Sequence, residues 1–199
     1  MLTALPSWLS PSLHTLQAAR SHALLLHGAS GLGQWQLGQA LAAAALCETP
    51  SAHGQACGQC TACQLLASHS HPDCYYLLPE TLLLDWGLPL DEKRQKELDE
   101  KKRKPSKIIS IDAVRETVEK LQQTSARARG QVVLAYPAEA MTVEAANAFL
   151  KTLEEPPENT WFFLSCREPD RLLATLRSRC RLHHLAVPQD SWALAWLER

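Results

Sequence analysis

The chain has 199 residues, a formal net charge of -1, and 46% hydrophobic and 21% charged residues. This composition is typical of a globular domain and excludes a disordered chain, a collagen and a coiled coil. The longest apolar run, Ala40–Cys47, is far shorter than the ~20 residues of a membrane helix, and no basic start precedes an apolar run. We therefore expect no membrane span and no signal peptide. Because the net charge is near zero, any contact with nucleic acid must be local.

Short apolar runs recur along the chain, with helix-like segments between them. The predicted strands are Ala23–His27, Cys74–Leu78, Gln131–Tyr136, Trp161–Cys166 and Arg181–Ala186. Most are apolar on both sides, which is typical of parallel strands covered by helices on both faces. The predicted helices between them include Leu32–Leu46, Asp112–Leu121 and Val143–Leu153. This alternation predicts an α/β sandwich.

A charged insertion at about residues 81–107 interrupts the alternation. Its part Asp91–Lys107 holds eight basic and five acidic residues and almost no apolar ones. Such a segment cannot form core, so we expect a solvated helix or a disordered loop before Ile108. We favour a solvated surface insertion, and the alternative is a local basic contact for DNA or a protein partner.

The segment His27–Gly33 reads HGASGLG and lies between a predicted strand and a predicted helix, where a phosphate-binding loop is found. The glycines of this degenerate loop are Gly28, Gly31 and Gly33. In the intact motif a lysine neutralises the phosphates and a Ser or Thr hydroxyl binds Mg²⁺, but Gln34 and Trp35 occupy these positions. Backbone N–H groups can still hold an anion. We expect no functional ATP site, and a plain glycine-rich turn is the alternative.

Seven cysteines in a chain without a signal peptide argue against a disulfide framework and for a reducing, cytoplasmic setting. Four of them have the spacing C-x9-C-x2-C-x2-C; they are Cys47, Cys57, Cys60 and Cys63. Four thiolates suit a closed tetrahedral Zn²⁺ site, which is structural because it has no open position. The alternatives are an iron–sulfur cluster and ordinary buried thiols. The other cysteines are expected in the core; they are Cys74, Cys166 and Cys180.

Two motifs in the second half carry a family resemblance. Residues 147–157 read NAFLKTLEEPP and residues 178–180 read SRC. With the cysteine cluster and HPD at residues 71–73, they resemble bacterial DNA polymerase III clamp-loader proteins, which are AAA+ proteins, over about residues 16–185. The resemblance implies a RecA-like five-stranded parallel sheet sandwiched by helices, with an inserted four-cysteine zinc module at about residues 47–63.

Within this family the chain resembles the non-hydrolysing delta-prime subunits. The motor subunits carry an Asp-Glu pair after the third strand, where this chain has Tyr136 and Pro137, and Glu139 stands two residues out of register. Both halves of the nucleotide site are therefore degraded. The resemblance assigns to Arg179 of SRC the role of an arginine finger in a neighbour's ATP site, where a permanently charged guanidinium stabilises the transferred phosphoryl group.

Other polar residues of this region have simpler interpretations. At helical spacing, Lys151 is expected to pair with Glu154 or Glu155 on a helix surface, before two prolines end the helix. We interpret this stretch as a structural helix that faces other subunits and DNA. Arg177 and Arg181 are expected to be structural. The histidines at 183 and 184 should point to opposite sides of a strand and be unrelated to the zinc.

The resemblance implies a scaffold subunit in DNA replication. Its expected partners are the gamma/tau motor and delta subunits, with the sliding clamp contacted indirectly and primed DNA within the complex. We expect an AAA+ core over residues 1–187 and the start of a truncated helical lid over 188–199, as in a fragment, a shortened gene product or an isolated domain. One alternative is a zinc-stabilised P-loop ATPase with an atypical site, and another is a zinc-dependent DNA-binding module, against which the net charge argues.

Overall fold

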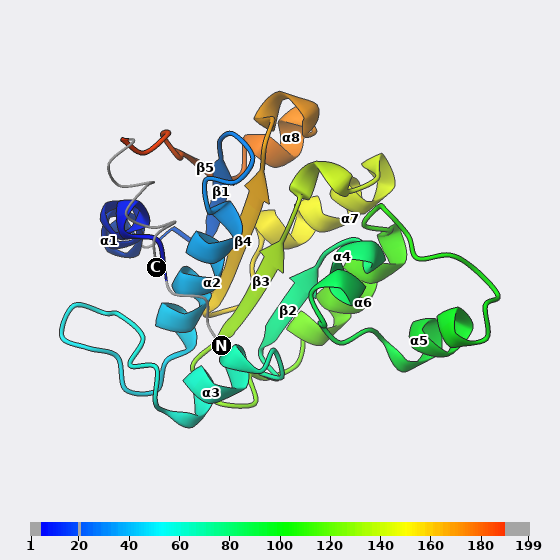
Figure 1. The fold of residues 1–199 in the computed structure, drawn as a ribbon, viewed down its shortest axis with the longest axis horizontal. Coiled ribbons are helices and arrows are strands. Elements are labelled where there is room, and N and C mark those ends of the chain that lie inside the picture. The colour runs from blue at the N-terminus through cyan, green and yellow to red at the C-terminus, as the bar shows by residue number, and fades with distance from the viewer. Residues whose placement is uncertain (1–4, 20, 190–199) are drawn as a thin grey trace.

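The computed structural model describes residues 5–19 and 21–189 of the chain. Five strands form one sheet in the order β2-β3-β4-β1-β5, and every neighbouring pair is parallel (Figure 1). The strands are β1 (Ala23–His27), β2 (Cys74–Leu77), β3 (Gln131–Ala135), β4 (Thr160–Cys166) and β5 (Arg181–His184). The predicted α/β sheet is confirmed, and several strands end one or two residues earlier than predicted. At β3 the cause is visible, because Pro137 has no N–H to donate to a neighbouring strand.

The three central strands are buried because their residues are apolar on both faces. All residues of β3 are buried, and so are nearly all of β1 and β4. The edge strand β5 differs from the prediction, since its residues are mostly exposed and Leu182 is 47% exposed. An edge strand has only one neighbour in the sheet, and polar side chains such as those of β5 suit it.

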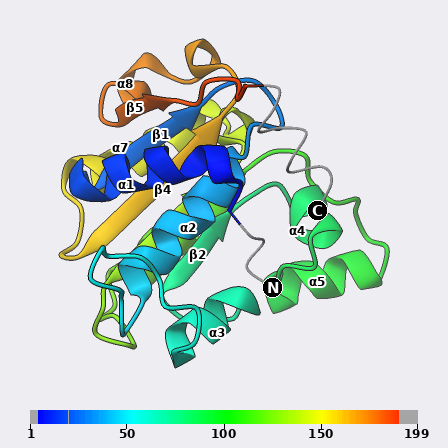
Figure 2. The ribbon, with the colours of Figure 1, turned by 60° about the vertical axis from the view of Figure 1, so that its left-hand side comes forward.

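Two helical layers cover the sheet. Leu24 and Leu26 of β1 point to the layer formed by α1 (Ser10–Ala19) and α2 (Gln34–Leu46), and Figure 2 shows these two helices on one face. Leu25 points to the opposite layer, with α6 (Ile111–Leu121) and α7 (Val143–Glu154). The alternation of side chains along each strand thus divides one apolar run between two cores.

Helices α6 and α7 begin at side-chain caps. The Ser110 hydroxyl accepts a hydrogen bond from Ala113 N at 3.3 Å, and the Thr142 hydroxyl accepts one from Ala145 N at 3.1 Å. Each bond satisfies an amide that the first turn of the helix leaves without a partner. These caps place both helices within one residue of their predicted limits.

The shorter elements lie around the edges of the sheet. They are η1 (Ser7–Leu9), α3 (Thr61–Ala67), α4 (Glu80–Asp85), α5 (Glu92–Asp99), η2 (Ala138–Ala140), η3 (Pro169–Arg171) and α8 (Ala174–Arg177). Of the two forms expected for the charged insertion, the structure has the helix, α5, which lies beyond α4 and α6 (Figure 1). The expected lid at 188–199 falls almost entirely outside the described residues. None of the described helices is long and apolar enough to cross a membrane.

Candidate functional site

The glycine-rich loop joins the carboxyl end of β1 to the first turn of α2, as predicted. A Cβ atom on Gly28 would lie 2.7 Å from the backbone oxygen of Leu185. Gly33 has a φ of +95°, and a Cβ atom there would lie 2.6 Å from Cδ1 of Leu9. Both positions therefore require glycine for close packing, and Gly33 also requires it for its backbone conformation. Gly31, with a φ of +87°, faces open space.

Gln34 fills the position of the missing lysine and turns back onto the loop. Its side-chain Nε2 donates hydrogen bonds of 2.7 Å to the carbonyl oxygens of Gly28 and Ala29. The residue is 3% exposed. The carboxamide thus satisfies two loop carbonyls and supplies no positive charge where the intact motif has an ammonium group.

Trp35 lies in a cluster of aromatic rings at the carboxyl end of the sheet. Its ring centroid is 5.0 Å from that of Trp86 and 5.9 Å from that of Tyr136, and Trp86 stacks on Tyr136 at 5.7 Å. The residues at positions 35 and 136, where the intact site has Mg²⁺ ligands, are therefore in contact with each other. An indole and a phenol do not provide the hard carboxylate or hydroxyl ligation that Mg²⁺ favours. Trp86, from the end of α4, could not be linked to this site from the sequence.

Glu139 is directed to the end of β4. Its carboxylate Oε1 accepts a hydrogen bond from Arg167 N at 3.0 Å and lies 3.7 Å from Arg167 Nε. The side chain is 9% exposed, and its buried Oε2 has no hydrogen-bond partner among the described residues. Glu139 thus has its own contacts, in a register different from that of an Asp-Glu pair.

Arg179 follows α8 and contacts the end of α7. Its Nε donates a hydrogen bond of 2.6 Å to Glu154 Oε1, its Nη2 contacts the same oxygen, and its Nη1 donates to Thr175 O at 2.8 Å. The side chain is 32% exposed. The expected pairing of Lys151 with a neighbouring glutamate is wrong for the described residues, since Glu154 pairs with Arg179 across the two motifs. Arg177 pairs with Asp170, in accord with a structural role.

The four cysteines of the predicted cluster come together although the chain between them is mostly irregular. All four Sγ atoms lie within 4.8 Å of one another. The separation is 3.9 Å between Cys47 and Cys60 and 4.0 Å between Cys57 and Cys63, so all four are free thiols. A tetrahedron with metal–sulfur bonds near 2.3 Å has sulfur–sulfur edges of about 3.8 Å. The cluster can therefore hold a metal ion.

Donor groups surround the sulfur of Cys57. It accepts hydrogen bonds from Thr49 Oγ1 at 3.2 Å, Gln59 N at 3.4 Å and Cys60 N at 3.2 Å. These bonds favour the thiolate and lower the pKa of Cys57 to about 6, with the Thr49 hydroxyl as the largest cause. Burial raises the pKa of the Cys63 thiol above its ordinary value. A metal ion would supply the positive charge that stabilises all four thiolates.

An ion pair links the cysteine cluster to the rest of the fold. Glu48, directly after Cys47, accepts a hydrogen bond of 2.9 Å from Arg127 Nε and also contacts its Nη2. The backbone at Arg127 is held in turn by Asp73, which accepts hydrogen bonds from Ala126 N at 2.7 Å and Arg127 N at 3.0 Å. The aspartate of HPD therefore has a structural role, which its position in the sequence did not reveal.

The histidines at the end of β5 lie apart from the cysteines. The rings of His27 and His184 have centroids 5.1 Å apart. Burial and the neighbouring His184 lower the pKa of His27, and burial lowers that of His183. In the part of the chain that the structure describes, the group of residues able to hold a metal contains cysteines alone.

Comparisons with known proteins agree with this geometry. The profile of a family described as "DNA polymerase III, delta subunit" matches residues 10–189. The DNA polymerase III subunit delta' of Escherichia coli K12 is 44% identical over 197 residues, which cover 96% of this chain and 52% of the relative. The protein of the same name from Pseudomonas aeruginosa is 40% identical, and the match covers 92% of this chain and 48% of that relative. The chain thus spans about half the length of these relatives.

A solved structure from Thermotoga maritima, titled a DNA polymerase III gamma subunit-related protein, has a TM-score of 0.59 and 24% identity, and covers 94% of this chain and 54% of that one. This likeness concerns the fold, and it agrees with the AAA+ architecture implied by the motifs. With the family profile over residues 10–189 and the relatives above, it leads to one conclusion. The chain belongs to the family of DNA polymerase III delta-prime subunits.

Proposed function

We propose that this chain acts in DNA replication as a non-hydrolysing clamp-loader subunit. The observation that carries the proposal is the contact of Trp35 with Tyr136, which puts aromatic rings where a motor subunit has Mg²⁺ ligands. Gln34 adds a neutral carboxamide in place of the lysine. A subunit without these groups lacks the charges that phosphoryl transfer requires. It can still serve as a scaffold for neighbours that hydrolyse ATP.

In this proposal Arg179 is the arginine finger for the ATP site of an adjacent motor subunit. Its guanidinium is partly exposed and pairs with one carboxylate, that of Glu154, which is itself 45% exposed. Exposed ion pairs of this kind contribute little to stability, about 0–1 kcal/mol. An incoming phosphate can therefore replace Glu154 as the partner of Arg179 without a large penalty.

We further propose that the four cysteines bind Zn²⁺ as a structural ion. Support comes from the sulfur–sulfur separations, which match a tetrahedral thiolate site, and from the absence of an open ligand position. Bound zinc would join the end of α2 to α3 through the thiolates of Cys47, Cys57, Cys60 and Cys63. The free thiols of the described residues suit a reducing, cytoplasmic setting.

The partners of the proposed subunit are the gamma/tau motor and delta subunits, with the sliding clamp contacted indirectly and primed DNA bound within the complex. We propose residues 1–187 as the AAA+ core and 188–199 as the start of a helical lid. Because the chain spans about half of its relatives, its capacity to join such a complex is the first point to test.

Reconstitution tests the proposal directly. The chain is mixed with its cognate motor and delta subunits, and ATPase activity stimulated by primed DNA is compared for the wild type, Arg179→Ala and Arg179→Lys. Arg171→Ala is the control, because Arg171 is an exposed arginine eight residues earlier, and its ion pair among the described residues is with Glu168 at 3.7 Å. We expect all forms to join the complex and both Arg179 variants to lose the turnover of the site that this residue completes.

Two results would contradict the proposal. Full turnover with Arg179→Ala, in a complex that contains the variant, would exclude Arg179 as the arginine finger. Turnover of Mg-ATP by the chain alone would favour the alternative of an atypical ATPase.

A further inference from the structure

The charged insertion ends in a run of positive charge. Residues Lys101–Lys107 read KKRKPSK, with five basic side chains and no acidic one. The rest of the chain is acidic, with 15 basic and 21 acidic residues, since the whole chain has 20 and 21. This run is therefore a local feature of the surface, next to α5 on the β2 side of the sheet (Figure 1).

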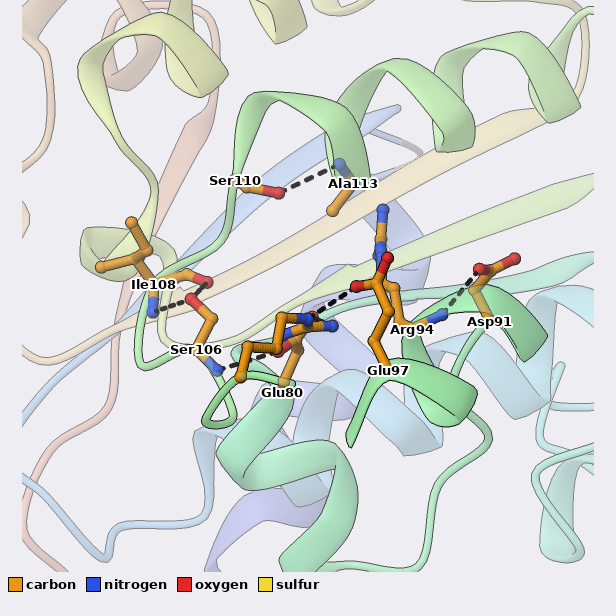
Figure 3. A network of polar contacts seen from close by, with 9 residues as sticks. Glu80, Asp91, Arg94, Glu97, Ser106, Ile108, Ser110 and Ala113 are labelled. Atoms are coloured by element: carbon orange, nitrogen blue, oxygen red, sulfur yellow. Dashed lines mark hydrogen bonds and ion pairs between the residues drawn. The ribbon is translucent and has the colours of Figure 1, made fainter. Parts of the chain in front are cut away.

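The run is fixed to the fold at Arg103. Its Nη1 and Nη2 donate hydrogen bonds of 2.5 and 2.9 Å to the two carboxylate oxygens of Glu80, and its Nε donates one of 2.8 Å to Glu97. Figure 3 shows Glu80 and Glu97 in this network of polar contacts. Glu80 also accepts a hydrogen bond from Ser106 N at 2.8 Å, and its side chain is 12% exposed. Bidentate pairing of this kind fixes geometry as well as charge.

Two further contacts hold the insertion on both sides. Ser106 O accepts a hydrogen bond from Thr81 N at 3.1 Å, which joins the run to the first turn of α4. Arg94 of α5 pairs with Glu116 of α6 at 3.2 Å. The backbone on either side of the run is thus held in place on the surface by specific contacts, which the sequence did not indicate.

These pairs engage four of the nearby carboxylates, whereas others on α5, such as Glu92, remain exposed. Glu80, Glu97 and Glu116 are engaged by arginines, and Lys102 pairs with Glu100 at 2.5 Å. Three lysines remain exposed, and no carboxylate of the described residues lies within ion-pair distance of them; they are Lys101, Lys104 and Lys107.

We propose that Lys101, Lys104 and Lys107 bind the phosphate backbone of DNA. Ammonium groups recognise phosphates as point charges and without sequence preference. Six residues of chain reach at most about 20 Å, enough to follow a few consecutive phosphates of one strand. The run has no apolar residue except Pro105, so it offers little to a hydrophobic protein interface. The inference does not depend on the role proposed for Arg179.

Fluorescence anisotropy of a labelled primed duplex, titrated with the whole chain at several salt concentrations, tests this contact. The test variant is Lys101→Gln, Lys104→Gln and Lys107→Gln combined. The matched control removes three exposed positive charges elsewhere, through Arg115→Gln, Arg129→Gln and Arg171→Gln combined. Circular dichroism verifies that each variant is folded. A third variant with arginine at all three lysine positions keeps the charge.

We expect the glutamine variant to bind at least tenfold more weakly at low salt, and the arginine variant to bind like the wild type. The slope of log K against log salt should become shallower by up to about 3, because each phosphate contact contributes about 0.9. Equal affinity of the wild type and the glutamine variant, or an equal loss in the control, would overturn the inference. So would an absence of DNA binding by the wild-type chain, in which case an acidic protein surface is the better partner. This assay contains no neighbouring subunit and no ATP, so its failure leaves the proposal for Arg179 untouched.

Discussion

Trp35 and Tyr136 lie ring against ring, with centroids 5.9 Å apart, although 101 positions separate them in the numbering. Trp35 is the second residue of α2, which begins directly after the glycine-rich loop, and Tyr136 follows the last residue of β3. The carboxyl ends of parallel strands lie at one edge of the sheet, so the residues that follow β1 and β3 lie near each other. Trp35 and Tyr136, which both stand where a motor subunit is expected to have Mg²⁺ ligands, therefore form a single packed contact.

Removing Trp35 should destabilise the fold. We expect Trp35→Ala to lower the free energy of unfolding by about 2–4 kcal/mol, since a half-buried indole loses contact with Tyr136 and Trp86. Trp86→Ala is the control, because Trp86 is 38% exposed and should matter less. Urea denaturation followed by circular dichroism measures both. A loss at Trp35 no larger than that at Trp86 would contradict this account.

The cysteine cluster should hold one zinc ion per chain. Elemental analysis of the purified protein measures it, and a chelator should lower the melting temperature because the ion holds the irregular segment together. Cys60→Ser should lose the metal, whereas Cys74→Ala, at a buried cysteine outside the cluster, should retain it. Iron with visible absorbance would favour an iron–sulfur cluster, and a stable protein without metal would favour ordinary thiols.

The contact of Arg179 with Glu154 should be weak in energy. A double-mutant cycle with Arg179→Ala and Glu154→Gln, measured by chemical denaturation, should give a coupling of about 1 kcal/mol or less, because both side chains are about a third or more exposed. Loss of turnover in Arg179→Ala would then reflect the missing guanidinium and not a damaged fold. A coupling above about 2 kcal/mol would instead make Arg179 a structural residue.

The tie between Glu80 and Arg103 should depend on pH. Burial raises the pKa of Glu80, but hydrogen bonds from Arg103 and Ser106 N outweigh it, so the pKa falls below its ordinary value of 4.5. Since the pKa is lower in the folded state, the stabilisation is complete above pH 4.5 and is lost as the pH falls through the folded value.

A comparison of melting temperatures between pH 7 and pH 3 tests this. Glu80→Gln should melt below the wild type at pH 7, and the difference should shrink towards acid pH as the wild-type carboxylate becomes protonated. Glu92→Gln is the control, because Glu92 is an exposed carboxylate on α5. A difference that stays constant with pH would show that shape and not charge matters at position 80.

The sheet could be predicted because its strands are apolar on both faces, a pattern that buried parallel strands require. The cysteine cluster could be predicted because its spacing allows four sulfurs to meet. The edge strand β5 was harder, since Leu182 and its polar neighbours contribute mostly to the surface. The end of β5 depends on its pairing with one neighbouring strand, and the local sequence does not encode that pairing.

The partners of single polar side chains were beyond sequence analysis. Glu154 has an obvious neighbour at helical spacing, Lys151, yet it pairs with Arg179, 25 residues away. Arg103 likewise reaches Glu80 across 23 residues. Such contacts follow from how helices are placed around the sheet, and they are visible only when the sheet is built. For the same reason, the ion pairs that hold the charged insertion could not be predicted from the sequence.

The glycines of the loop have a consequence for interpreting such motifs in other chains. Gly28 leaves room for the backbone of Leu185, and Gly33 leaves room for Leu9. Either glycine would be required here even if no phosphate ever approached the loop. Steric demand from the surrounding protein can therefore preserve the spacing of a nucleotide-binding motif after its chemistry is gone, and glycine spacing by itself is a poor guide to whether a domain binds ATP.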